Sequence, residues 1–402
     1  AQQAPPLETT IPLQRWCHLD PKHEAPLPID DTDGGCEDVE KVKNFKAWSR
    51  QIATIEVKEG DAVTDSAEAY YLMKQRGIAN VIVMGVHTNK CVLGRPFSIR
   101  QLKYQGLNVV LMRDMTDTMY NPRMKPFVSH FTGNDLVVEH IEKYWCPTIT
   151  SVDVIGGKPF VFPDDKRPHL VIVANESEYR SEQTLPAFAQ QYLGRDFRVS
   201  LVFGSSLDGN DFHGLEALAD ADLALFVVRR RTPSAAQLDL VRKFIASGKP
   251  VVGLRTASHA FAPPKGKTPP TGHAEWPEFG KEILGCNYTG HHSVKDKTTV
   301  RLQLDAGKHP VLTGLPAGET TLPSWLYKSA PLNDKATPLL IGKVEGQAEE
   351  PVAWTYTHSG GGRVFYTSLG HPEEFQSPFF RRLLLNGIYW AAGLEVPAKL
   401  AE

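Results

Sequence analysis

A cysteine stands shortly after a strand-like run in the first half of the sequence. The run Asn80-Val-Ile-Val-Met-Gly-Val86 is apolar throughout, which is typical of a strand buried on both faces of a sheet. Cys91 then opens a stretch with helical spacing that is closed by Gly106. Unpaired N–H groups and the positive end of a helix dipole stabilise a thiolate, so a cysteine placed there can act as a nucleophile. The alternative is that Cys91 is a small apolar residue packed beneath the helix.

Polar residues also follow several strand-like runs in the second half of the chain. Three of these runs are 169–174, 250–254 and 362–370. Ligands of open α/β sheets bind at the carboxyl ends of the strands, so polar side chains at these points should meet in one pocket. We therefore expect a substrate-binding site that contains Glu178, Tyr179, His259, His292, His371 and Glu374.

Histidines and a carboxylate that meet in one pocket suit two kinds of chemistry. They could bind a divalent metal, or they could act as acid and base on a sugar. No HxxxH-type spacing supports the metal hypothesis, so the metal ligands stay unknown at this stage. For each histidine taken alone, a capping or solvent-facing side chain is the alternative.

Aromatic and basic residues in the same half could help to hold a ligand. Trp276, Trp325, Tyr327 and Trp354 could stack on a sugar ring, although aromatic residues also fill cores. The triplet Arg229-Arg-Arg231 follows a strand-like run and could receive a phosphate or a carboxylate. A solvated strand end is the alternative for this triplet.

Strand-like and helical runs alternate in both halves, which predicts an α/β protein with two doubly wound parallel-sheet domains. The first domain, 51–155, should have strands at 52–57, 80–86, 108–113 and 148–154. The second, 169–395, should have strands at 169–174, 197–203, 222–228, 250–254 and 362–370. Residues 1–50 form an irregular segment rich in Pro, Asp and Gly, and the Pro-rich stretch 156–168 reads as a linker.

Composition excludes several classes of protein. The 402 residues carry 44 Lys plus Arg against 46 Asp plus Glu, a net charge of −2 that gives no general attraction to nucleic acid. No apolar run approaches the roughly 18 residues of a membrane span. Five scattered cysteines exclude a dense disulfide framework, although Cys17 and Cys36 could form one bridge in an exported protein. The start at Ala1 is typical of a processed or engineered chain, and removal of a signal peptide and cleavage within a longer precursor are the two alternatives for processing. We expect export to the periplasm, with the cytoplasm as the alternative.

The first domain resembles the isochorismatase-like cysteine hydrolases, a group that includes nicotinamidases. The residues that carry the resemblance are Gly85-Val-His-Thr-Asn-Lys-Cys91, Arg95, Gly106, Asn108–Asp114 and Thr116-Asp117. The resemblance implies a Rossmann-type three-layer domain with a six-stranded parallel sheet. It also implies Cys91 as nucleophile and the peptide around Val86–His87 as part of an oxyanion hole.

The chain departs from this family in two of the three residues of the family's Asp, Lys and Cys triad. Lys58 is the nearest candidate for the lysine, with Arg50 as the alternative, and no strand in 1–50 offers the aspartate. A thiol without its carboxylate lacks the proton acceptor of general-base catalysis. We expect a second polypeptide of roughly 80–120 residues, the upstream part of a cleaved precursor, to complete the domain. A degenerate domain, or completion by another subunit or a second copy in a homo-oligomer, is the alternative.

The second domain resembles the ThuA-like (trehalose-utilisation) family, whose fold is class I glutamine-amidotransferase-like, or flavodoxin-like. Gly362-Arg-Val-Phe-Tyr-Thr-Ser-Leu-Gly-His371 and Pro378–Gly393 carry the resemblance, with support from His309–Leu315, Gly285–His292 and Pro250–His259. Amidotransferases place a nucleophilic cysteine after the strand that corresponds to 250–254. Here that turn is Arg255-Thr-Ala-Ser258, so glutaminase chemistry is excluded.

Together these features predict a hydrolase that uses Cys91 on a small amide-like or carbohydrate-derived substrate, fused to a ThuA-like carbohydrate-related domain. The alternative is a non-catalytic carbohydrate-binding or scaffold protein in which both sites are degenerate. The expected partners are a small-molecule substrate and the completing polypeptide, with no nucleic acid and no membrane span.

Overall fold

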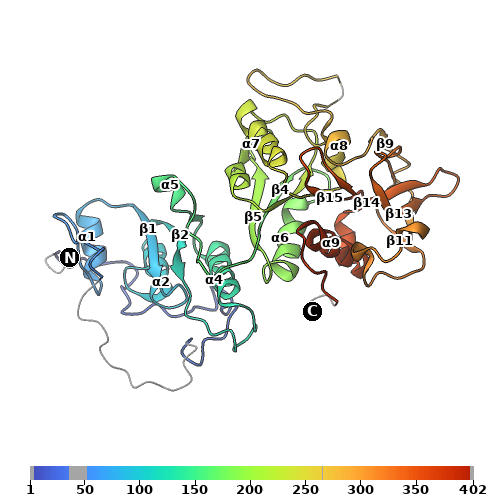
Figure 1. The fold of residues 1–402 in the computed structure, drawn as a ribbon. Helices are drawn as coiled ribbons and strands as arrows, with labels where there is room; N and C mark the ends of the chain where they lie inside the picture. The colour runs from blue at the N-terminus through green and yellow to red at the C-terminus, as the bar shows by residue number, and fades with distance from the viewer. Residues whose placement is uncertain (1–3, 36–51, 265, 399–402) are drawn as a thin grey trace. The chain divides into compact units, whose positions relative to one another are not determined.

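The computed structural model describes residues 4–35, 52–264 and 266–398. The chain divides into an N-terminal unit, Ala1–Lys166, and a C-terminal unit, Arg167–Glu402. Figure 1 shows the elements of each unit. Within the described residues, no helix is both long and apolar enough to cross a membrane.

The N-terminal unit is built on three parallel strands in the order β1-β2-β3. These strands are β1 (Asn80–Val86), β2 (Asn108–Asp117) and β3 (Thr148–Ile149). Its helices are α1 (Glu68–Gln75), α2 (Cys91–Gly94), α3 (Ile99–Tyr104), α4 (His130–Tyr144) and α5 (Val152–Ile155). Buried side chains of α2, α3, β2 and α4 form most of its core, because apolar residues of each element recur on the face turned to the others.

Strand β1 is not buried on both faces, so this part of the sequence prediction is wrong. Ile82, Met84 and Val86 are 44%, 52% and 60% exposed, whereas the alternate residues Val81 and Val83 pack against the core. In the described part of the chain β1 pairs with β2 alone, which leaves its other edge open. The predicted strand at 52–57 is also absent: these residues form exposed turns and coil, without a neighbouring strand to pair with.

The predicted helix from Cys91 to Gln105 is broken into α2 and α3. Pro96 lies between them, and Arg95 before it has an extended backbone with ψ 156°. The proline ring disfavours a helical conformation of the preceding residue, and proline has no N–H for the helix ladder. Cys91 therefore opens a helix of only four residues.

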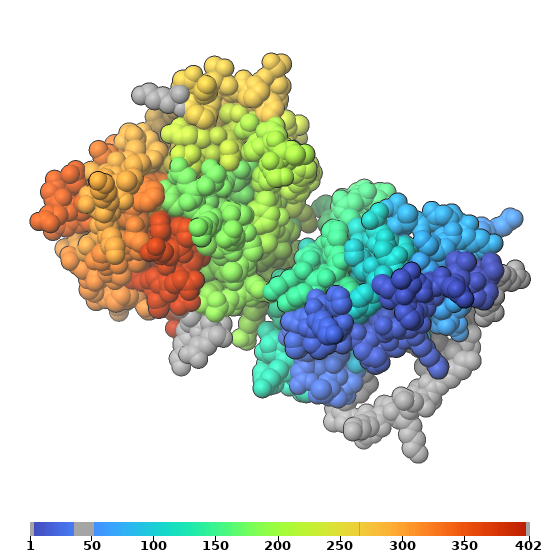
Figure 2. All heavy atoms as spheres, turned by 180° about the vertical axis from the view of Figure 1, so that it is seen from behind, coloured from blue at the N-terminus to red at the C-terminus, as the bar shows by residue number. Residues whose placement is uncertain are grey.

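The segment 4–35 has no helix or strand but is anchored to the rest of its unit, over whose surface it lies in dark blue in Figure 2. The fully buried carboxylate of Glu24 accepts hydrogen bonds from Arg100 at 2.7 Å, His140 at 2.8 Å and Trp145 at 2.9 Å. Burial opposes ionisation of Glu24, but these hydrogen bonds outweigh it and lower its pKa to about 2. Cys17 is buried nearby with a free thiol, and Cys36 and Arg50 lie outside the described residues.

The C-terminal unit contains a ten-stranded mixed sheet in the order β11-β10-β13-β14-β15-β8-β7-β4-β5-β6. Its centre, β15-β8-β7-β4-β5, is parallel, and the flanking strands are antiparallel. The parallel strands are β4 (His169–Asn175), β5 (Arg198–Gly204), β7 (Leu223–Val228), β8 (Val251–Leu254) and β15 (Arg363–Thr367). The antiparallel strands are β6 (Phe212–His213), β10 (Thr298–Leu302), β11 (Thr320–Leu322), β13 (Thr337–Lys343) and β14 (Glu350–Thr357).

The predicted purely parallel sheet is therefore corrected to a mixed one. The antiparallel strands β10, β11, β13 and β14 come from a part of the sequence whose apolar pattern is too irregular to identify strands. A separate pair, β9 (Gly290–His291) and β12 (Tyr327–Lys328), lies in the same region. The sequence pattern at 212–220 predicts a helix, whereas the structure has β6 followed by the 3₁₀ helix η1 (Leu215–Ala219).

Helices cover both faces of the parallel strands in the C-terminal unit (Figure 1). Helices α6 (Ser181–Tyr192) and α9 (Pro378–Ala391) pack on one face, and α7 (Ala235–Ala246) and α8 (Phe279–Glu282) pack on the other. Every residue of β4 and of β7 is buried, as expected for central strands covered on both sides. Short 3₁₀ helices complete the unit: η2 (Arg255–His259), η3 (Leu304–Ala306), η4 (Pro310–Leu312) and η5 (Pro372–Gln376).

Candidate ligand-binding site

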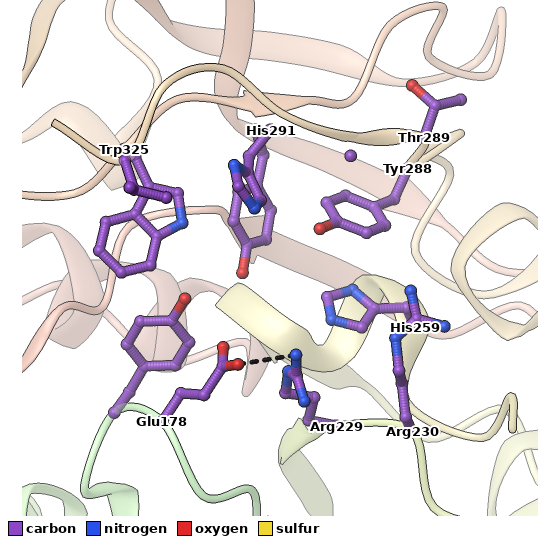
Figure 3. A pocket seen from close by; sticks show the side chains of 12 residues that line it. Glu178, Arg229, Arg230, His259, Tyr288, Thr289, His291 and Trp325 are labelled. Carbon is purple, nitrogen blue, oxygen red and sulfur yellow. Dashed lines mark ion pairs between the residues drawn. The ribbon is translucent and has the colours of Figure 1, made fainter. Parts of the chain in front are cut away.

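A cavity of about 710 Å³ lies at the carboxyl ends of β4, β7 and β8. The sheet order changes direction at β4, because β5 lies on one side of it and β7 and β8 lie on the other. Such a point opens a crevice in α/β sheets, and the volume is in the range of small-molecule sites. The lining residues, most of them labelled in Figure 3, are Glu178, Tyr179, Arg229, Arg230, His259, Tyr288, Thr289, Gly290, His291, Val294, Trp325 and Tyr327.

The loop after β4 is held in place by a buried carboxylate. Glu176 accepts backbone N–H hydrogen bonds from Glu178 at 2.6 Å, Tyr179 at 2.8 Å and Ser181 at 3.0 Å. These bonds satisfy the donors that precede α6 and fix the direction in which Glu178 and Tyr179 leave the backbone. Glu176 is thus a positioning residue for two members of the cavity.

Two arginines after β7 bring positive charge to the cavity. The guanidinium of Arg229 forms a 2.7 Å ion pair with the carboxylate of Glu178 (Figure 3). Arg230 has a left-handed backbone with φ 49°, and its N–H donates to the carbonyl of His259 at 3.1 Å. A left-handed conformation costs a non-glycine residue about 1–2 kcal/mol, so the surrounding contacts must hold Arg230 in place.

His259 is a neutral imidazole over most of the physiological pH range. Its ring stacks on Tyr288 with 4.3 Å between centroids. Burial lowers the pKa of His259 to about 3, and the charges of Arg230 and Arg229 act in the same direction. Its Nδ1 is 3.1 Å from the hydroxyl oxygen of Ser258. A histidine with this pKa is a weak base, so it does not activate Ser258 as a nucleophile.

Arg255 lies beneath the aromatic wall of the cavity. It follows β8 with φ 45°, is fully buried, and places its guanidinium carbon 4.2, 4.9 and 4.8 Å from the ring centroids of Tyr179, Trp325 and Tyr327. The guanidinium donates to the Ser324 hydroxyl at 2.9 Å and to the carbonyl of Ser368 at 2.7 Å. A cation held by this many contacts fixes three rings that face the ligand side.

The cavity brings together some of the residues that the sequence singled out. Glu178, Tyr179 and His259 line it. Glu374 is fully buried and accepts backbone N–H bonds from Ser324, Gly370 and His371, so its role is to cap the turn before η5 rather than to meet a substrate. His371 caps the same turn, and its ring centroid lies 5.9 Å from that of Trp325 and 6.4 Å from that of Tyr179, but His371 is not among the residues that line the cavity.

The structure places His291, rather than His292, at the cavity. His291 pairs with Tyr327 across β9 and β12, and successive residues of a strand point to opposite sides. The imidazole of His292 contacts Gln347 instead. Among the four aromatic residues considered for stacking, Trp325 and Tyr327 line the cavity, whereas Trp276 and Trp354 do not. Tyr288, Thr289 and Val294 were not predicted, because they lie in an irregular segment with no strand pattern to place them.

The surroundings of Cys91 lack a complete catalytic set in the described residues. Cys91 is partly exposed with a free thiol, and the Val86–His87 peptide that precedes it is cis. The described residues show no hydrogen bond between this thiol and a carboxylate or Lys58, whose backbone N–H binds Asp61 in an exposed loop. The carboxylate of Asp31 contacts Asn89 at 2.7 Å and Lys90 at 3.4 Å, beside Cys91 in sequence. A four-residue helix also gives little dipole, so this support for a thiolate is weaker than the sequence suggested.

Within the described residues, no group of three or more His, Cys, Asp or Glu side chains is arranged to hold a metal ion. The divalent metal considered for the C-terminal unit stays a prediction. Elemental analysis of the purified protein is the direct measurement.

A protein-family model described as ThuA, trehalose utilisation, matches residues 169–391, more than half of the chain. No curated protein matches the chain. Among solved structures, ThuA-like proteins from Bacteroides uniformis and Parabacteroides merdae are 20% and 18% identical to it, with TM-scores of 0.42 and 0.44. Each match covers 58% of this chain, and 95% and 92% of the respective protein. A β-galactosidase from Rahnella sp. R3 is 12% identical over 62% of this chain and 33% of its own, with a TM-score of 0.36.

Proposed function

Because the chain belongs to the ThuA (trehalose utilisation) family, we propose that its C-terminal unit binds a carbohydrate in the cavity at the carboxyl ends of β4, β7 and β8. The observation that carries this proposal is the composition of the cavity wall. Aromatic rings, Trp325 and Tyr288 among them, lie opposite the polar groups of Glu178 and Arg229 (Figure 3). Sugar rings present apolar C–H faces that pack on aromatic rings and hydroxyl groups that need polar partners.

The polar residues would orient the sugar rather than attack it. The Glu178 carboxylate accepts hydrogen bonds from sugar hydroxyls, and Arg229, which already holds that carboxylate, limits its movement. The neutral imidazole of His259 can exchange a hydrogen bond with a hydroxyl without adding charge. Binding of a carbohydrate is thus the function that this geometry supports best.

The test is to measure sugar binding with the whole protein and with variants of the aromatic wall. Saturation-transfer NMR with trehalose, glucose, galactose and glucuronate serves as the binding assay. We expect Trp325→Ala and Tyr288→Ala to weaken binding about tenfold, since each removes a stacking surface. Trp276→Ala is the matched control, because Trp276 lies outside the cavity. The proposal is contradicted if none of the four sugars binds, or if Trp325→Ala binds them as tightly as the unchanged protein does.

A second candidate function is hydrolysis of a small amide-like or carbohydrate-derived substrate by Cys91 in the N-terminal unit. It is favoured by the position of this partly exposed thiol shortly after β1, together with the edge of that strand that no other described strand pairs with. The exposed side chains of Ile82, Met84 and Val86 form an apolar face on β1. An added polypeptide could cover this face and supply the missing carboxylate.

Native mass spectrometry of the protein isolated from its source tests this second candidate. We expect a further polypeptide of roughly 80–120 residues bound to the chain. If the chain is isolated alone, the completing-polypeptide hypothesis fails and a degenerate N-terminal unit is the better account. Fractionation of the same cells tests the proposed periplasmic location.

A further inference from the structure

The charges that line the cavity are not balanced. Glu178 is the one carboxylate among the lining residues, and Arg229 and Arg230 are two guanidinium groups. The 2.7 Å ion pair between Glu178 and Arg229 neutralises one of them. The second guanidinium, that of Arg230, has no carboxylate within ion-pair distance among the described residues.

The backbone of Arg230 is held in position, while, among the described residues, most hydrogen-bond donors of its guanidinium remain unused. The guanidinium makes one hydrogen bond in the described part of the chain, a long 3.5 Å contact from Nη1 to the carbonyl of Pro263. A guanidinium has five N–H donors, so most of them are free for a ligand. The backbone of Arg230 is fixed by the bond to His259 in a strained left-handed conformation. Strain of this kind is retained where the surrounding structure keeps a side chain in a required place.

The electrostatic potential around Arg230 is positive as well. Burial and the charges of Arg230, Arg229 and Arg255 together lower the pKa of His259 to about 3, so this ring does not take a proton near neutral pH. Figure 3 shows Arg230 beside His259, with Arg229 facing Glu178. This environment therefore favours a group that accepts hydrogen bonds and carries negative charge.

We propose that the carbohydrate bound in this cavity is acidic, with a carboxylate that forms a charge-assisted pair with Arg230. This inference rests on the proposed carbohydrate-binding function and names the substrate class, sugars of the uronic acid type. The single unbalanced guanidinium matches a carboxylate with one negative charge better than a phosphate ester with nearly two. The aromatic wall holds the ring, and Arg230 selects for the acid group.

The test compares sugars that differ only in the acid group. D-glucuronate, D-glucose and D-glucose 6-phosphate are titrated into the whole protein at low ionic strength, with saturation-transfer NMR as the measurement. We expect glucuronate to bind about tenfold more tightly than glucose, and more tightly than the phosphate ester. Added salt should reduce this preference, since screening weakens a partly exposed ion pair.

Variants of Arg230 then assign the preference to this residue. Arg230→Gln should bind glucuronate and glucose with equal affinity, while Arg230→Lys should keep part of the preference through its charge. Arg195→Gln is the matched control, because Arg195 is an exposed arginine that precedes β5 and so lies at the amino end of the parallel strands, whereas the cavity lies at their carboxyl ends. It should behave as the unchanged protein does.

The outcomes separate this inference from the proposed function. If glucose binds as tightly as glucuronate, or if Arg230→Gln keeps the preference, the acidic-sugar inference is overturned although carbohydrate binding stands. If glucose 6-phosphate binds more tightly than glucuronate, the preferred acid group is a phosphate ester rather than a carboxylate, and the acidic-sugar inference as stated is also overturned. If none of the sugars binds, both proposals fail.

Discussion

The guanidinium carbon of Arg255 lies 4.2 Å from the ring centroid of Tyr179, and its Nη2 is 3.3 Å from the Tyr179 hydroxyl oxygen. Tyr179 lines the cavity, whereas Arg255 belongs to the buried turn after β8. In this way a core cation determines the position of a ring in the binding site. The turn that follows β8 thus supplies a residue that supports the site rather than one that lines it.

Replacing Arg255 should weaken both stability and ligand binding. Arg255→Lys keeps the charge but cannot reach Ser324 and Ser368 together in the planar geometry of a guanidinium. We expect a loss of about 2–3 kcal/mol in the free energy of unfolding of the C-terminal unit. Denaturant unfolding followed by circular dichroism measures it, with Arg195→Lys as the exposed control. An unchanged midpoint would show that the stacked geometry contributes little.

The low pKa of His259 predicts a specific pH dependence of stability. The folded protein binds this proton only near pH 3, whereas an unfolded histidine binds it near pH 6.5. The contribution of His259 is therefore complete above pH 6.5 and is lost as the pH falls from 6.5 towards 3. Where the unfolded protein binds one proton more than the folded protein, the free energy of unfolding changes by about 1.4 kcal/mol per pH unit.

His259→Phe keeps a ring against Tyr288 and removes this titration. Between pH 6.5 and 4, the unfolding free energy of the variant should fall less steeply than that of the unchanged protein. The two curves should run parallel above pH 6.5. Chemical denaturation at a series of pH values provides the comparison, and parallel curves over the whole range would refute the assigned titration.

Glu24 should be essential for attaching the segment 4–35 to its unit. Glu24→Gln removes the charge that pairs with Arg100 in a buried site, and breaking such a pair costs about 3–5 kcal/mol. Because the pKa of Glu24 is lowered, its contribution to the stability of the folded protein is present above pH 4.5 and is lost as the pH falls towards 2. Hydrogen exchange of the segment measures the effect. Glu8→Gln, an exposed change in the same segment, should leave the exchange rates unaltered.

Cys91 should be the most reactive of the described thiols. Burial raises the pKa of Cys146 to about 11 and that of Cys286 to about 12, so neither forms a thiolate near neutral pH. Cys91 is partly exposed and accessible to a reagent. Iodoacetamide labelling at pH 7.5, followed by peptide mass spectrometry, should modify Cys91 first. The guanidinium-unfolded protein, in which the thiols become equivalent, is the control, and labelling of Cys91 no faster than Cys146 in the folded state would mark it as a packing residue.

The sequence alone located most of the parallel strands. Apolar runs such as Leu223–Val228 are a local signal, because a central strand must be apolar on both faces. The same reasoning was wrong for β1, since whether a run is covered depends on partners elsewhere. It also overlooked Pro96, although this residue was visible in the sequence and ends α2.

Which side chains meet in the cavity was decided by the tertiary structure. His291 and His292 differ only in strand parity, and the pairing of β9 with β12 determines which one faces the cavity. Arg230 is a strand-end arginine in the sequence, and only the fold shows that Glu178 pairs with Arg229, which leaves Arg230 without a carboxylate partner among the described residues. Secondary structure follows from neighbours a few residues apart, whereas a binding site depends on contacts between segments that are distant in the sequence. The sequence therefore determined the ThuA family of the C-terminal unit and the parallel strands of its sheet, and only the fold determined which charged groups and rings meet in the site.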